Sequence, residues 1–198
     1  YGIDGMRALD ATVDYIRTKY PEIFLIADAK RGDIGNTAKM YAKAFFEEMD
    51  FDAVTIAPYM GADSVTPFLE YKDKWAIVLA LTSNASAYQF QNAQKDGKPL
   101  YQAVMEEMME ISTPDNMMFV VGATKADKLT ELRSFCPDNF FLVPGVGAQG
   151  GSAEEVIAHG ANDHGGLLIN SSRGILFADS TENYAKVAAE VAAKTANL

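Results

Sequence analysis

Short apolar runs alternate with amphipathic segments along most of the 198-residue chain. Each apolar run has the length of a β-strand, and the segments between the runs carry apolar residues at the spacing of a helix face. This alternation predicts six strands, over residues 23–27, 53–58, 75–81, 117–122, 140–144 and 167–170. It also predicts helices over residues 3–20, 36–48, 100–111, 126–134, 153–159 and 181–195, and a further helix that follows residues 61–64 and ends near Tyr71.

The order of these elements predicts an α/β fold. Strands that are apolar throughout are typical of a parallel sheet covered by helices on both faces. Because a (β/α)8 TIM barrel typically takes about 250 residues, we interpret residues 1–198 as a single barrel domain covering about six of the eight strand–helix units. The first strand, the first helix and the second strand are expected to lie outside this sequence. The same elements also fit an open doubly wound sheet.

The first apolar run leads into a cluster of charged residues, Asp28, Lys30 and Asp33. Residues two apart on a strand share a face, so Asp28 and Lys30 are expected to point the same way. Charges at the end of a buried strand are costly to desolvate unless they pair. The cluster fits a structural ion pair, but carboxylates grouped around one ammonium at the mouth of a sheet favour a functional site.

The residues after this cluster predict a turn and a new helix. Gly32 and Gly35 permit a tight turn, because glycine adopts backbone conformations that other residues avoid. Asn36 or Thr37 is expected to cap the helix that follows.

Two features after the later strands favour phosphate binding. The glycine-rich loop over residues 145–151 can bring several backbone N–H groups close to an anion. Arg173, after the last strand, supplies a planar fork suited to bidentate phosphate binding. Loops after the last two strands of a barrel are its usual phosphate site, although a glycine-rich loop also serves as a plain connection.

The polar segment over residues 82–99 is longer than an ordinary connection. It fits a lid that closes over a ligand, or a solvated excursion with a helical turn. Ser83, at the base of the segment beside the third strand, is a more secure candidate for a role than the tip.

Composition narrows the choice of partners. A formal net charge of −10 argues against nucleic acid and anionic membranes. The single cysteine, Cys136, allows no internal disulfide and fits a reducing cytoplasm. His159 and His164 are expected on the opposite face from the candidate residues, so neither they nor Cys136 is expected to act in catalysis. The sequence therefore gives no clustered ligands for a transition metal.

Four segments of the chain resemble the orotidine 5′-phosphate decarboxylases. The most specific is Asp28-Ala-Lys-Arg-Gly-Asp-Ile-Gly-Asn-Thr37; the others are Leu81-Thr-Ser83, Pro144-Gly-Val-Gly-Ala-Gln149 and Asn170-Ser-Ser-Arg-Gly-Ile175. Ala57-Pro-Tyr-Met-Gly61 and Ser171-Ser-Arg-Gly-Ile175 are most similar to bacterial and archaeal members with the longer chain. The resemblance implies cofactor-free, metal-free decarboxylation of orotidine 5′-monophosphate to UMP in de novo pyrimidine biosynthesis.

The resemblance also implies roles for single residues. Lys30 would stabilise the carbanion left at C6 of the pyrimidine and then protonate it, while Asp28 presses on the departing carboxylate. In the family, the aspartate and threonine that match Asp33 and Thr37 come from the partner subunit, which implies a homodimer with shared active sites. The remaining substrate contacts implied are Ser83 to the pyrimidine, Gln149 and Arg173 to the phosphate, and Gly147 and Gly150 in the same loop.

Two other functions remain open at this point. A sugar-phosphate decarboxylase or hexulose-phosphate aldolase of the same superfamily shares the Asp-x-Lys-x-x-Asp pattern but uses Mg²⁺, and the continuation through Ile34, Asn36 and Thr37 favours the orotidylate branch. A non-catalytic phosphometabolite-binding subunit is the other alternative. The family's array also contains an Asp and a Lys from the first two strands, neither of which is in this sequence.

Overall fold

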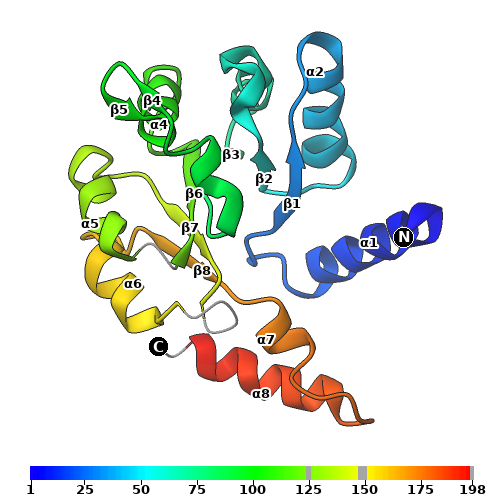
Figure 1. The fold of residues 1–198 in the computed structure, drawn as a ribbon. Coiled ribbons are helices and arrows are strands. Elements are labelled where there is room, and N and C mark those ends of the chain that lie inside the picture. Colours follow the sequence, from blue (N-terminus) through cyan, green and yellow to red (C-terminus); the bar gives the residue numbers. More distant parts are fainter. Residues whose placement is uncertain (124–125, 147–150, 197–198) are drawn as a thin grey trace. The chain divides into compact units, whose positions relative to one another are not determined.

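The computed structural model describes residues 1–123, 126–146 and 151–196. The chain divides into two compact units. The first unit comprises Tyr1–Leu79 and Glu107–Met117, and the second comprises Ala80–Glu106 and Met118–Leu198. In both units strands and helices alternate along the chain, as the colours in Figure 1 show.

The first unit contains three parallel strands that pair in chain order, β1, β2 and β3. All four residues of β2 are buried, as expected for a strand covered on both faces. The largest fully buried side chains of the first unit include Phe68, Ile56 and Ile77. Its elements are α1 (Gly2–Lys19), β1 (Ile26–Arg31), α2 (Gly35–Lys43), β2 (Ala53–Ile56), the short helices Pro58–Met60, Ala62–Ser64 and α3 (Thr66–Leu69), and most of β3 (Trp75–Leu81).

The second unit contains the parallel strands β6, β7 and β8, again paired in chain order. Its core includes the fully buried Phe119, Phe141 and Leu129. None of the helices in the described part of the chain is long and apolar enough to cross a membrane. The elements are a 3-10 helix (Ala85–Gln89), the hairpin β4 (Gln94–Lys95) and β5 (Lys98–Pro99), most of α4 (Leu100–Glu110) and of β6 (Met117–Val121), α5 (Ala126–Phe135), β7 (Phe141–Pro144), α6 (Ala153–Gly160), β8 (Leu167–Asn170), α7 (Arg173–Leu176) and α8 (Tyr184–Ala196).

The first strand begins later than the apolar pattern predicts. The expected strand covered residues 23–27, whereas β1 starts at Ile26 and includes Asp28 and Lys30. The reason lies in the backbone of the preceding residues, whose polar groups bond to side chains. Ile23 O accepts from Arg17, and Leu25 N donates to the Asp52 carboxylate.

The predicted cap of the following helix is wrong. Helix α2 begins at Gly35, so Asn36 and Thr37 lie inside its first turn, and the N-cap residue Ile34 makes no side-chain cap. Gly35, the first residue of α2, has φ +57°, in the left-handed region that glycine adopts without strain. The helix continues to Glu48 as predicted, but its last part, Ala44–Glu48, is a π-helical turn.

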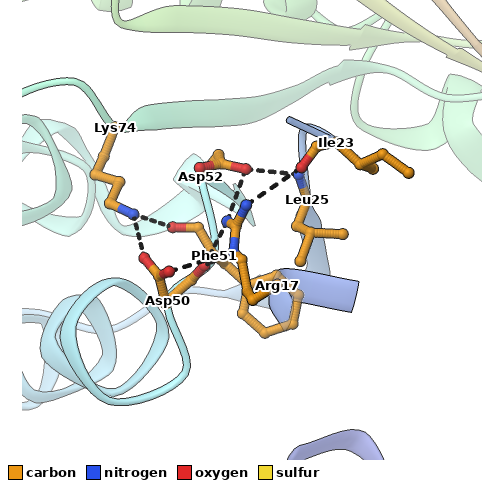
Figure 2. Close-up of polar contacts among 7 residues, drawn as sticks. All are labelled: Arg17, Ile23, Leu25, Asp50, Phe51, Asp52 and Lys74. Carbon is orange, nitrogen blue, oxygen red and sulfur yellow. Dashed lines mark hydrogen bonds and ion pairs between the residues drawn. The ribbon is translucent and has the colours of Figure 1, made fainter. Parts of the chain in front are cut away.

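One arginine ties together the starts of β1 and β2. Arg17, in the last turn of α1, donates to Ile23 O and Asp50 O and forms a 2.8 Å ion pair with Asp52 (Figure 2). Lys74 extends this cluster by donating to Phe51 O and to Asp50. Because only 19% of the Arg17 side chain is exposed, its loss would leave several carbonyl groups without a donor.

A second arginine does the same in the other unit. Arg133, in the last turn of α5, donates to the carbonyls that precede β7 and β8, and its guanidinium stacks 4.0 Å from the centre of the Phe141 ring. Burial lowers the pKa of Arg133, whose hydrogen-bond acceptors among the described residues are all backbone carbonyls. The carbonyl oxygens that accept from it belong to Cys136, Pro137, Asn139, Gly160 and Gly166.

We expect Arg133→Ala to lower the free energy of unfolding by about 2–4 kcal/mol, because it leaves buried carbonyls unpaired. Arg7→Ala is the matched control, since Arg7 forms an exposed pair with Asp4 on α1 and should contribute less than about 1 kcal/mol. Urea unfolding followed by circular dichroism measures both. Equal losses for the two variants would contradict the assigned role of Arg133.

Candidate functional site

The predicted pair of opposite charges is present in β1. Lys30 Nζ donates to Asp28 Oδ1 at 2.5 Å, which confirms that the two side chains lie on the same side. Lys30 is 52% exposed and Asp28 is 65% exposed. An exposed pair stabilises a fold by about 1 kcal/mol at most, so a purely structural role explains it poorly. Its exposure instead leaves both charges available to a ligand.

The backbone under this pair is irregular. Lys30 has φ +46°, in the left-handed region that residues other than glycine rarely occupy. The pairing of β1 with β2 shifts register between Ala27 and Arg31, which defines a bulge. Backbone strain of this kind costs of order 1–3 kcal/mol and collects at functional sites. The bulge therefore adds a second, independent mark of a site.

Thr55 contacts both members of this pair, although no motif in the sequence singles it out. It is fully buried in β2, and its hydroxyl contacts both the Lys30 backbone and the Asp28 carboxylate. The available signal was a single hydroxyl within an otherwise apolar strand. Such a group requires a hydrogen-bond partner when buried, so its partner was worth seeking.

Asp33 and Thr37 follow β1 but do not join the pair. Asp33 Oδ1 accepts from the backbone of Ile34 at 2.8 Å. Within the described residues Asp33 forms no ion pair with Lys30. Thr37 is exposed in the first turn of α2. The chain therefore brings together Asp28 and Lys30 with Thr55, and leaves Asp33 and Thr37 outside that contact.

Ser83 in the second unit lies where β3 ends. A β-carbon on Gly122, just after β6, would come within 2.8 Å of the Ser83 β-carbon, so glycine is needed for this close approach. The segment over residues 82–99 is folded back on its base. Gln91 accepts from Thr82 N at 2.9 Å and donates to the Thr82 hydroxyl at 2.8 Å.

The predicted phosphate-binding residues are only partly described. Arg173 is exposed and is the first residue of α7, three residues after the end of β8 at Asn170. Gly147, Gln149 and Gly150 lie outside the described residues. A β-carbon on Gly151, the next described residue, would come within 2.5 Å of the Ala123 β-carbon, so Gly151 packs tightly against the residues that follow β6.

The two histidines and the cysteine all lie in the second unit. His159 Nδ1 lies 2.9 Å from the Thr130 hydroxyl, and His164 is exposed in a turn. Burial raises the pKa of the Cys136 thiol to about 11, which keeps it protonated and unreactive. Among the described residues no three His, Cys, Asp or Glu side chains gather closely enough to hold a metal ion.

The fold and the charged pair together define a class. Parallel strands alternate with helices, and the candidate side chains follow or end the strands, which is typical of enzymes built on the (β/α)8 barrel. A sequence profile described as "Orotidine 5'-phosphate decarboxylase / HUMPS family" matches residues 4–188. The chain belongs to this family.

Individual relatives within this family are named orotidine 5′-phosphate decarboxylases. An orotidine 5′-phosphate decarboxylase of Christiangramia forsetii is 55% identical over 187 residues, which cover 94% of this chain and 69% of the relative. One from Phocaeicola vulgatus is 54% identical over 98% of this chain and 71% of the relative. The chain is thus shorter than the relatives that it matches.

Solved structures agree with the barrel interpretation. The structure of Leishmania donovani OMP decarboxylase superimposes with a TM-score of 0.83 at 35% identity, over 96% of this chain and 72% of that one. The prediction of a (β/α)8 fold is therefore confirmed, and the open doubly wound sheet is not supported.

Proposed function

We propose that this protein removes CO₂ from orotidine 5′-monophosphate to give UMP, the reaction for which its relatives are named. The observation that carries the proposal is the exposed Lys30–Asp28 pair on its strained strand, in a chain 55% identical to a curated decarboxylase. The alternatives from the sequence are weakened because the similar curated proteins carry the decarboxylase name rather than that of an Mg²⁺-dependent sugar-phosphate enzyme.

The chemistry requires a cation at C6 of the pyrimidine. When the C6–CO₂ bond breaks, its electron pair stays on C6 in the ring plane, where the ring π system cannot delocalise it. The Lys30 ammonium stabilises that developing charge and then transfers a proton to C6, and the resulting amine regains a proton from water. Asp28, hydrogen-bonded to Lys30, places a negative charge beside the ammonium and opposes the substrate carboxylate before it leaves.

Residues of the second unit are assigned to the rest of the nucleotide by resemblance. Ser83 contacts the pyrimidine, and Arg173 binds the phosphate through its planar guanidinium. Gln149, with Gly147 and Gly150, completes the phosphate contacts. The exposure of Arg173 supports this assignment, because its guanidinium is accessible to an anion.

The proposal includes a homodimer with shared active sites, in which Asp33 and Thr37 act on the partner's substrate. Asp33 supports this arrangement, since its carboxylate bonds to Ile34 N and not to Lys30 of its own chain. Because the relatives are longer than this chain, we also propose that the full-length enzyme supplies a further Asp and Lys from two earlier strands. A cytoplasmic location fits the single, buried cysteine.

The full-length protein should convert orotidine 5′-monophosphate to UMP at an undiminished rate in excess EDTA, because the ammonium of Lys30 supplies the positive charge. The fall in absorbance on loss of the carboxylate measures the rate. Loss of activity in EDTA and its return with Mg²⁺ would move the assignment to the sugar-phosphate branch. Tight nucleotide binding without turnover would favour the non-catalytic subunit.

Lys30→Ala should lower kcat by about 1,000-fold or more, since it removes both the stabilising charge and the proton donor. Lys72→Ala is the matched control, because the Lys72 side chain is 92% exposed and lies in the turn before β3. Steady-state kinetics and circular dichroism on both variants are required. A folded Lys30→Ala protein with near-normal kcat would show that another group is the catalyst.

Mixing full-length Lys30→Ala and Asp33→Ala subunits tests the shared site. If Asp33 acts on the partner's substrate, each mixed dimer has one intact site and one doubly altered site. Random exchange in an equal mixture should then restore about a quarter of wild-type activity. If Asp33 acts within its own chain, every site carries one lesion and the mixture remains inactive.

A further inference from the structure

The bulge in β1 places Lys30 opposite a single buried residue of β2. Between the paired positions Ala27↔Val54 and Arg31↔Ile56, β1 advances four residues while β2 advances two. Thr55 is the one β2 residue between these pairs, and it is fully buried. Thr55 is therefore the β2 residue placed to give the extra residues of β1 the hydrogen-bond partners that regular strand pairing does not supply.

The Thr55 hydroxyl accepts a hydrogen bond from the irregular part of the backbone. Lys30 N donates to Thr55 Oγ1 at 2.9 Å. This bond holds the N–H of the residue whose φ is +46°. A left-handed conformation at a lysine persists only where surrounding contacts fix it, and this hydroxyl is such a contact.

The same hydroxyl directs its proton toward the other member of the charged pair. Thr55 Oγ1 lies 3.1 Å from Asp28 Oδ1 and 3.5 Å from Ala27 O, so the carboxylate is the nearer acceptor. Asp28 Oδ1 also accepts from Lys30 Nζ at 2.5 Å. The buried Thr55 side chain thus contacts both the backbone N–H of Lys30 and the carboxylate of Asp28.

We propose that Thr55 is a positioning residue for decarboxylation, acting through Lys30 and Asp28 without touching the substrate. The inference rests on the proposed function, because it concerns the aim of the proposed catalytic ammonium. The hydroxyl fixes the bulge from which the Lys30 side chain departs, and it orients the carboxylate that holds Nζ. A displacement of about 1 Å in a catalytic group can lower a rate by about 100-fold.

The decisive comparison is between Thr55→Val, which keeps the branched shape but lacks the hydroxyl, and Thr55→Ser, which keeps the hydroxyl but lacks the methyl group. In the full-length enzyme, Thr55→Val should lower kcat by about 10- to 100-fold with less than about a threefold change in KM. Thr55→Ser should keep kcat within about threefold of wild type. The reverse order of the two variants would overturn the proposal, because it would assign the effect to methyl packing.

Two controls keep the result interpretable. Thr12→Val makes the same change at an exposed helix threonine whose hydroxyl bonds to Ala8 O, and it should leave kcat unaltered. If Thr55→Val does not fold, Thr55→Ala and Thr55→Ser provide a second pair that differs only in the hydroxyl. Equal kcat values within that pair would overturn the proposal.

Amide hydrogen exchange of Lys30 separates this inference from the proposed function. The Lys30 N–H should exchange at least about tenfold faster in Thr55→Val than in wild type or Thr55→Ser, whatever reaction the enzyme performs. Unchanged exchange would show that the hydroxyl does not hold the bulge. A wild-type protein inactive on orotidine 5′-monophosphate, but with the expected exchange pattern, would refute the proposed function and leave the positioning bond intact.

Discussion

Two partly buried arginines hold the backbone just before four of the strands, β1, β2, β7 and β8. Arg17 and Arg133 each lie in the last turn of a helix and donate to carbonyls just before the following strands. Hydrogen bonds from a charged donor are worth roughly 1.5–3 kcal/mol each, so a guanidinium with several acceptors can hold the segment that precedes a strand. Once the start of a strand is fixed, its length determines where the strand ends. The site residues that follow the strand are placed by that end.

Most of the fold was predictable because its strands are apolar throughout. The limits of the third and last strands, 75–81 and 167–170, follow directly from their sequence runs, and the structure confirms them. The pattern failed where side chains replace backbone partners. Ile23 and Leu25 are apolar, yet their backbone groups bond to Arg17 and Asp52, and the strand therefore starts later. Hydropathy carries no information about such long-range partners.

The candidate site was predictable in its residue types but not in its geometry. The spacing of Asp28 and Lys30 was sufficient to place them on one side of a strand, which the 2.5 Å contact confirms. The positive φ of Lys30 and the role of Thr55 were not accessible, because a bulge depends on the register between two strands that are distant in sequence. A threonine is also common in strands, so its identity alone did not distinguish it.

The exposure of the Lys30–Asp28 pair determines when the free-energy cost of removing water from its two charges arises. In the free protein both charges remain in contact with water, a medium of high dielectric constant that weakens their attraction and keeps them hydrated. Folding therefore bears little of the desolvation penalty of the site. That penalty arises when a ligand covers the pair, in a medium of lower dielectric constant where the same charges act more strongly on it. The free protein can thus keep the Lys30 ammonium at its surface without a large loss of stability, and the contacts of a ligand that covers the pair must offset the removal of water.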